Sequence, residues 1–319
     1  MTSSAGYDAL PDRLGPVVTK ELRQGLRRAT FVVPFLAVQA LAALATWLEF
    51  QTGADTGNSS PAFMNIHMLF ASGPFWLAAT TVCMVLMPLA GLQLLTGELD
   101  AGNHELLHMA GLSRWQIVRG KFLALWGLCA LTFVSMLPYL VVRYFVGGIE
   151  WTREATCATT LLCGTALMAA GAIGASGFRN IAARIGVLLL FLVSTTTSGA
   201  IAMLSGVVFG TMFNAIFYHI NALGVVVCFV IIGLGLARGR LRHSHMPYEA
   251  RQSSLILLTL AALPFVTAIA MIMTCSLGVV APVLAALIAL RHDRPFPHSR
   301  GHLALPPPLP PPPGGASAG

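Results

Sequence analysis

Residues 104–108 spell His-Glu-Leu-Leu-His, the clearest grouping of chemically active side chains in the chain. On a helix, His104 and His108 stand one turn apart on the same face, where their imidazoles can hold a zinc ion. Glu105 then activates a zinc-bound water as a general base, which is the chemistry of a metalloprotease. This spacing therefore supports one hypothesis: a zinc protease with His104 and His108 as metal ligands.

A zinc protease also needs a third protein ligand. Glu150 and Glu154 are predicted on the opposite side of the membrane from this motif, and Glu249 and Asp293 belong to no recognisable ligand pattern. The missing ligand favours a second interpretation of the segment, in which Glu105 has a different role. We therefore keep the protease as the alternative and predict no catalytic or metal site on this chain.

The motif lies inside a longer polar segment, residues 97–121, with the sequence GELDAGNHELLHMAGLSRWQIVRGK. Its apolar residues fall close to helical spacing and glycines interrupt it, which predicts a short helix across the membrane face. Ser113 is placed to cap a second helix that begins at Arg114 and leads into an apolar run. A helix in this position is suited to docking another protein.

Long apolar runs dominate the rest of the chain and identify a membrane protein. Hydrophobic residues make up 56% of the 319 residues and charged residues 10%, with a mean hydropathy of +0.76. A helix needs roughly 20 apolar residues to cross a bilayer. Runs of this kind cover Phe31–Phe50, Phe75–Leu95, Phe122–Val146, Thr156–Gly177, Arg184–Gly210 and Asn214–Ala237. Residues 255–290 are too long for one crossing, and Gly278 and Pro282 predict a break into two, which gives about eight spans.

Basic residues set the orientation of these spans. Of the 19 Lys and Arg residues, all except Arg143 and Arg153 fall on one predicted side. This bias places that side, with both termini, in the cytosol. It also accounts for the net charge of +7 without a nucleic-acid partner. Arg143 lies near the outer end of the third span, where we expect its side chain to reach the membrane interface; binding of an anionic substrate is the alternative.

Several elements occur in a restrictive order along residues 15–145. A basic amphipathic segment, Val17–Arg28, precedes the first span. A Glu-x-x-x-Gly-x-x-Glu-Leu-Leu element follows the second span, and then come a Gly-Leu-Ser element and an Ile-Val-x-Gly-Lys element that opens the third. In this order the chain resembles the permease subunit of ATP-binding-cassette transporters of the type-2 exporter branch. The residues that carry the resemblance after the second span are Glu98, Gly102, Glu105, Leu106, Leu107, Gly111, Leu112, Ser113, Ile117, Val118, Gly120 and Lys121.

The resemblance implies a role for each segment. Val17–Arg28 would be an interfacial elbow helix, and 97–121 would hold a coupling helix that seats on a separate ATPase subunit through Glu98, Gly102, Glu105, Leu106, Leu107, Gly111, Leu112, Ser113 and Lys121. Two permeases, identical or related, would join two ATPases. The chain departs from the family pattern in having almost no outer element at 211–213 and two extra spans after the sixth.

The chain itself carries no motif for binding ATP. It has no Gly-x-x-x-x-Gly-Lys-Ser/Thr loop to hold phosphates, and the Gly120-Lys121 pair is followed by Phe122. We therefore expect ATP and Mg²⁺ on the partner subunit, no cofactor on this chain and no enzymatic activity of its own.

The sequence thus predicts an all-α, polytopic helical protein of the inner (cytoplasmic) membrane. Residues 1–29 would form a cytosolic N-terminus with the elbow helix, 30–291 the transmembrane domain, and 292–319 a disordered, proline-rich cytosolic tail. The predicted function is an ATP-driven permease, an exporter by resemblance, whose partners are the ATPase, a second permease and membrane lipid. The substrate is left open.

Overall fold

The computed structural model describes residues 15–52, 64–95, 113–147, 150–178, 180–208, 214–243, 254–274 and 278–292. All regular secondary structure in these ranges is helical. Seven of the helical segments are long and apolar enough to cross a membrane. The prediction of an all-α, multi-pass membrane protein is therefore confirmed.

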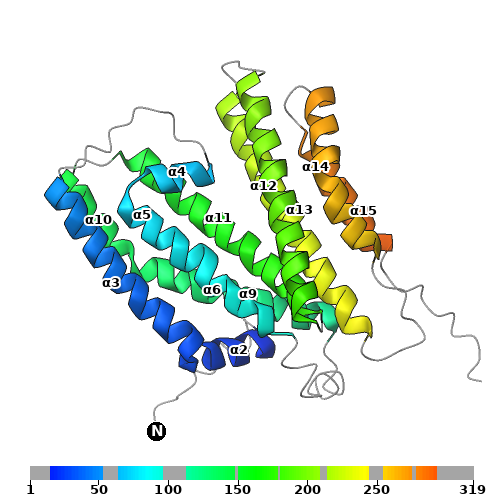
Figure 1. The fold of residues 1–319 in the computed structure, drawn as a ribbon, viewed down its shortest axis with the longest axis horizontal. Helices are drawn as coiled ribbons and strands as arrows, with labels where there is room; N and C mark the ends of the chain where they lie inside the picture. Colours follow the sequence, from blue (N-terminus) through cyan, green and yellow to red (C-terminus); the bar gives the residue numbers. More distant parts are fainter. Residues whose placement is uncertain are drawn as a thin grey trace, which may run out of the picture.

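The helices lie side by side in one bundle and slope from the upper left to the lower right of the view (Figure 1). Their bounds are α2 Pro16–Arg27, α3 Ala29–Thr52, α4 Ile66–Ala71, α5 Pro74–Ala79, α6 Met87–Leu89, α9 Arg114–Ser135, α10 Leu137–Gly147, α11 Trp151–Ser176, α12 Ile181–Val208, α13 Asn214–His243, α14 Ser254–Thr274 and α15 Val280–His292.

The second span is helical throughout but irregular. A π-helical stretch at Thr80–Leu86 separates α5 from α6, and a 3-10 turn over Ala90–Gln93 follows α6. Pro88 explains the change, because it has no N–H to donate and its ring would clash with the carbonyl four residues earlier. Widening the preceding turn to a π-helix relieves that clash.

The third span is longer than predicted, and it is kinked. It begins at Arg114 rather than at Phe122, since Ser113 caps α9: its Oγ accepts a hydrogen bond from the Gln116 backbone N–H, and the Gln116 Oε1 accepts one from the Ser113 backbone N–H. The predicted cap is therefore confirmed. Met136 separates α9 from α10, where Pro138 interrupts the backbone hydrogen bonds.

The apolar stretch 255–290 forms two helices, as predicted. Helix α14 ends at Thr274, Gly278 and Val279 form a turn, and α15 packs back against α14. Helix α15 has 13 residues. At about 1.5 Å per residue it is roughly 20 Å long, which is shorter than the ~30 Å hydrocarbon layer. The described residues thus contain seven full-length spans and one shorter apolar helix, rather than eight spans of full length.

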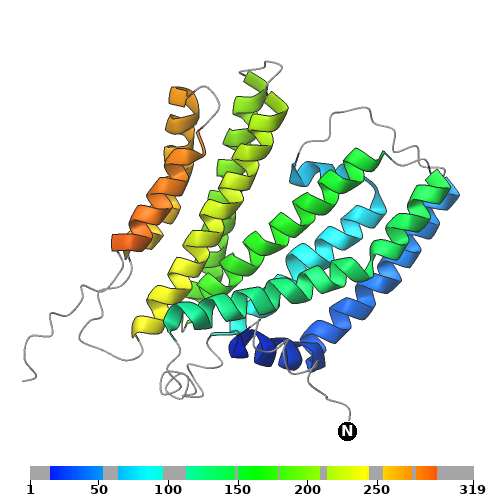
Figure 2. The same ribbon diagram turned by 180° about the vertical axis from the view of Figure 1, so that it is seen from behind.

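Helices α11 and α13 pack against each other and cross in the middle of the molecule (Figure 2). A methyl group on Gly174 would lie 2.8 Å from the Gly233 carbonyl oxygen, and one on Gly233 would lie 2.6 Å from the Ala170 carbonyl oxygen. Small residues therefore let the two backbones approach closely, the usual way that helices associate in a membrane. Gly174 and Gly233 therefore serve helix packing.

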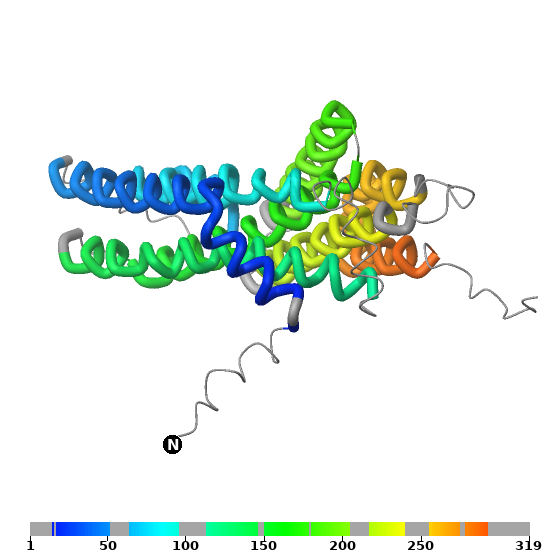
Figure 3. The backbone as a smooth tube through the Cα atoms, turned by 90° about the horizontal axis from the view of Figure 1, so that it is seen from below, coloured from blue at the N-terminus to red at the C-terminus, as the bar shows by residue number. Residues whose placement is uncertain are grey.

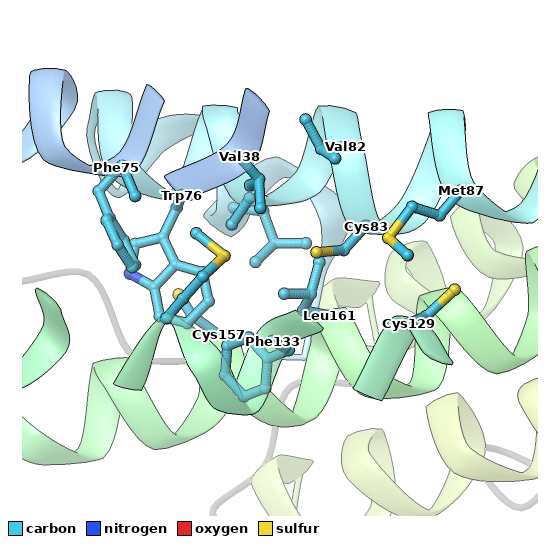
Figure 4. Packing of buried hydrophobic residues seen from close by; sticks show 14 of the residues in the cluster. Val38, Phe75, Trp76, Val82, Cys83, Met87, Cys129, Phe133, Cys157 and Leu161 are labelled. Atoms are coloured by element: carbon cyan, nitrogen blue, oxygen red, sulfur yellow. The ribbon is translucent and has the colours of Figure 1, made fainter. Parts of the chain in front are cut away.

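Apolar cores lie on both sides of this crossing. One is built from α3, α5, α9 and α11, where Trp76, Phe133 and Leu161 interlock (Figure 4). The second core is built from α11, α12, α13, α14 and α15. In it the rings of Phe191 and Phe229 pack edge to face, with their centroids 5.6 Å apart.

Helix α2 runs across the ends of the spans instead of along them. From below it passes from the row containing α3 towards the row containing α9 (Figure 3). Val17, Val18 and Glu21 are buried against the bundle, while Lys20 and Arg23 are exposed. The predicted amphipathic helix at Val17–Arg28 is thus present, with its basic face outward.

Candidate functional site

The predicted coupling segment divides between described and undescribed residues. Glu98, Gly102, His104, Glu105, Leu106, Leu107, His108, Gly111 and Leu112 lie outside the described residues. Ser113 and Lys121 are described, as is the rest of the segment that joins the loop to the third span. The structure therefore defines the base of the loop, meaning Leu94, Leu95 and residues 113–121.

Lys121 is the most constrained charge at this base. Its side chain is 2% exposed, and its Nζ lies 3.2 Å from Glu21 Oε1 and 3.1 Å from the Leu94 carbonyl oxygen. Glu21 belongs to α2, Leu94 ends the second span and Lys121 belongs to α9. One ammonium group therefore joins three segments where the loop begins and ends. Lys121 lies inside the protein, where its contacts hold the base together.

Glycines allow α2 to lie close enough for this contact. A methyl group on Gly120 would lie 2.7 Å from Val17 Cγ1, and one on Gly25 would lie 2.6 Å from Leu128 Cδ1. Both distances are far below van der Waals contact. The Gly-Lys pair at 120–121 therefore has two linked roles: the glycine admits α2, and the lysine pairs with it.

Trp115 ties the base to the sixth span. Its ring lies below two guanidinium groups, with Arg119 Cζ 4.6 Å and Arg238 Cζ 5.9 Å from the ring centroid. Arg238 comes from α13, at the end predicted to be cytosolic. A cation over the face of an indole contributes about 0.5–1 kcal/mol at an exposed site.

Beneath these polar contacts lies a small apolar cluster. Its buried members are Leu95, Ile117, Val118, Leu125, Ala169, Ile173, Leu234 and Ala237, from the end of the second span, α9, α11 and α13. A well-packed cluster transmits displacement because it has little free volume. A force on the loop would therefore reach the two helices that cross at the centre of the bundle.

A second polar centre, absent from the sequence prediction, lies at the other end of the spans. Arg143 is 4% exposed. Its Nε donates to Glu49 Oε2 at 2.5 Å, and its Nη1 lies 3.1 Å and 3.2 Å from the two oxygens of Glu154. The predicted extension of Arg143 to the interface is therefore wrong: two carboxylates hold it inside.

The surrounding residues complete this centre. The Trp76 indole N–H donates to Glu154 at 2.9 Å, and the Phe75 backbone N–H donates to Glu49 at 3.1 Å. Arg143 also donates to the Ser72 carbonyl, and its guanidinium lies 4.8 Å from the Phe75 ring centroid. We call Glu49, Arg143 and Glu154 the outer triad, after the side of the membrane that this end is predicted to face. It fastens the ends of α3, α10 and α11 around the start of α5.

The sequence indicates that each residue of the outer triad needs a partner, but it does not indicate which residues pair. Each of Glu49, Arg143 and Glu154 lies within two turns of a predicted span end. Their neighbours in the sequence are apolar, and an unpaired charge in such surroundings is energetically costly. Pairing them required knowing that α3, α10 and α11 adjoin at that end, which the span pattern does not specify.

Neither centre resembles a metal site. The described residues contain no group of three or more His, Cys, Asp or Glu side chains placed to hold a metal ion, and His104 and His108 lie outside those residues. What the described contacts supply is mechanical: one base that joins α2, α9 and α13, and one triad that fastens the far ends. Comparisons with models of known protein families, with curated proteins and with solved structures find no match for this chain.

Proposed function

We propose that this protein is the permease subunit of an ATP-driven transporter, with an exporter as the direction that the family resemblance favours. The separate ATPase would dock on the loop 97–121. Lys121 is the observation that carries the proposal, because one buried ammonium links Glu21, the Leu94 carbonyl and α9 at the base of that loop. A loop anchored in this way cannot be displaced without moving the helices that hold it.

The proposed mechanism follows from this anchoring. ATP brings two ATPase subunits together, and their motion pulls the docked loops. Each loop base then moves α9 and, through Trp115 and the apolar cluster, the inner ends of α11 and α13. The spans change their tilt and a path opens towards the outer side. The outer triad lies at that far end and would have to loosen or move as one body.

The resemblance supplies the partners. It implies a P-loop ATPase and a second permease, identical or related, in a bacterial inner membrane with both termini in the cytosol. The basic ends of α2 and α13 are consistent with that orientation.

The first experiment is a pull-down of the tagged full chain from its native membrane in mild detergent, with the co-purifying proteins identified. We expect a P-loop ATPase in stoichiometric amount. A preparation without any ATPase, but with one zinc ion per chain that His104→Ala removes, would instead establish the alternative, a membrane zinc protease.

The second experiment tests the docking residues. Glu98→Arg, or Leu106→Arg with Leu107→Arg, should reduce ATPase recovery strongly while the chain still inserts into the membrane. Glu150→Arg is the matched control, since Glu150 is exposed at the predicted outer end. Equal recovery of the ATPase with all these variants would contradict docking through the loop.

A further inference from the structure

Helices α10 and α11 enclose a groove that the proposed transport cycle does not use. Helix α10 ends at Gly147 and α11 begins at Trp151, at the same end of the bundle (Figure 1). The cavity between them measures about 510 Å³ and is lined by five residues of α10 and four of α11. Cavities that bind small molecules measure about 300–1,000 Å³. The groove is thus large enough for an extended ligand.

The groove opens towards the surface that the bilayer covers. Five large apolar or aromatic lining residues are exposed, with fractions from 42% at Leu137 to 80% at Phe145; the others are Val141, Tyr144 and Trp151. Tyr144 and Trp151 in the lining are of the type found at the level of lipid headgroups. A molecule already dissolved in the membrane can therefore enter from the side, with an apolar chain against α10 and α11.

One lining residue is charged, and it sits beside the outer triad. Glu154 accepts hydrogen bonds from Arg143 and Trp76, and its Oε1 receives a single contact at 3.2 Å from Arg143 Nη1. A carboxylate oxygen can accept more than one hydrogen bond. The groove therefore ends at the Glu154 carboxylate, which has further acceptor capacity.

The charges of this end favour a cation over an anion. The Glu49 and Glu154 carboxylates share the single guanidinium of Arg143, so the outer triad has one carboxylate more than it has cations. Arg143 is 4% exposed and already bonded to both triad carboxylates, and Arg153 is 8% exposed and donates to Ser72 and Ala71. Glu154 lines the groove and neither arginine is among its described lining residues, so a phosphate or carboxylate there would meet Glu154 before it reached either cation.

We propose that the groove binds a membrane amphiphile with an ammonium headgroup. The hydrocarbon chain lies between α10 and α11, and the ammonium group donates a hydrogen bond to Glu154. Hydrogen bonds between an ammonium and a carboxylate are among the stronger ones in proteins. This binding site does not depend on the proposed coupling to an ATPase, and it is tested without one.

Three single-chain probes with one hydrocarbon tail test the headgroup. The delipidated full chain is incubated with oleylamine, oleyl alcohol or oleic acid, and bound molecules are counted by native mass spectrometry. A hydrogen bond to a charged group contributes about 1.5 kcal/mol, so oleylamine should bind roughly tenfold more tightly than oleyl alcohol. Equal binding of the amine and the acid would overturn the proposal.

Two variants locate the site. Ala155→Phe fills the groove from an exposed lining position, and it should remove most of the bound oleylamine. Thr159→Phe is the matched control, because Thr159 is exposed one turn further along α11 and does not line the groove. Glu154→Gln, checked for folding by size exclusion, should leave tail binding intact and reduce the preference for the amine. Wild-type binding by Ala155→Phe would also overturn the proposal.

Discussion

The ammonium group of Lys121 lies 3.2 Å from the carboxylate of Glu21, although a hundred residues of chain separate them. Both side chains are almost completely buried, at 2% and 8% exposure. Removing two charges from water costs several kcal/mol for each, so such a pair persists only when its geometry is good and its remaining hydrogen bonds are satisfied. The Leu94 carbonyl supplies one such bond.

Replacing one member of this pair should lower the free energy of unfolding more than replacing both members. Lys121→Met leaves the Glu21 carboxylate buried without a partner, which is expected to lower the free energy of unfolding by about 3–5 kcal/mol. Lys121→Met combined with Glu21→Leu removes both charges and should recover much of that loss. Thermal unfolding in detergent, followed by the monodisperse fraction on size exclusion, measures each variant.

A matched control for the pair is Arg23→Met, because Arg23 is exposed on α2, the helix that carries Glu21. It should unfold within about 0.5 kcal/mol of the wild type, as surface substitutions usually do. If the losses in unfolding free energy of Lys121→Met alone and Glu21→Leu alone simply add in the double variant, Lys121 and Glu21 do not stabilise one another.

Much of the fold could be predicted because membrane spans have a strong signal. The long apolar runs, the cap at Ser113 and the break near Gly278 all depend on neighbouring residues, and all appear in the structure. The π-helix before Pro88 was not predicted, nor was the joining of the helix that begins at Arg114 to the third span as one continuous helix. A hydropathy pattern reports the burial of a segment, not how its backbone hydrogen bonds are arranged.

The polar centres were harder to predict because they depend on contacts between distant segments. Gly120 and Lys121 could be placed at the start of a span, but their contacts with Val17 and Glu21 depend on the direction in which α2 crosses. The sequence correctly places Arg143 near the end of the third span. It does not predict that the side chain is held between Glu49 and Glu154, because these residues come from other helices.

Loss of Arg143 should destabilise the outer end of the bundle. Arg143→Gln leaves two carboxylates, Glu49 and Glu154, close together without their shared cation, and like charges at that range repel one another. We expect a strong fall in the folded fraction. Arg143→Lys should recover little, because an ammonium group cannot match the several directions in which the guanidinium donates.

A second substitution should rescue the first. Glu154→Gln in the Arg143→Gln background removes one of the two unpaired carboxylates, so the double variant should be more stable than Arg143→Gln alone. Recovery of folded protein on fluorescence-detected size exclusion gives the comparison. No rescue, together with a wild-type level for Arg143→Gln, would contradict a stabilising role for the triad.

Gly120 should not tolerate a larger side chain while Val17 is present. In Gly120→Ala the new methyl group would lie 2.7 Å from Val17 Cγ1, so α2 must move away and weaken the contact between Glu21 and Lys121. Val17→Ala in the same chain removes the clashing methyl group and should restore part of the stability. The midpoint of thermal unfolding measures both.

Gly186→Ala is the control for that substitution. Nothing lies within 4 Å of a methyl group placed there, and Gly186 is inside α12. Alanine is favoured over glycine within a helix by about 1 kcal/mol, so this variant should match or exceed the wild type. A fall in stability as large as that of Gly120→Ala would mean that the loss comes from glycine replacement in general and not from α2.

The orientation of the chain can be tested with single cysteines at opposite ends of the bundle. Arg27 and Trp151 are both exposed, and Trp151 lies near the outer triad, whereas Arg27 ends the helix that crosses the other end. In a background without the native cysteines, Trp151→Cys should react with a membrane-impermeant maleimide added to intact cells. Arg27→Cys should react only after the cells are opened, because the basic end is predicted to face the cytosol. The opposite pattern would reverse the orientation and would place the base of the loop 97–121, and with it the proposed ATPase docking site, outside the cell, where no ATP is available to drive the cycle.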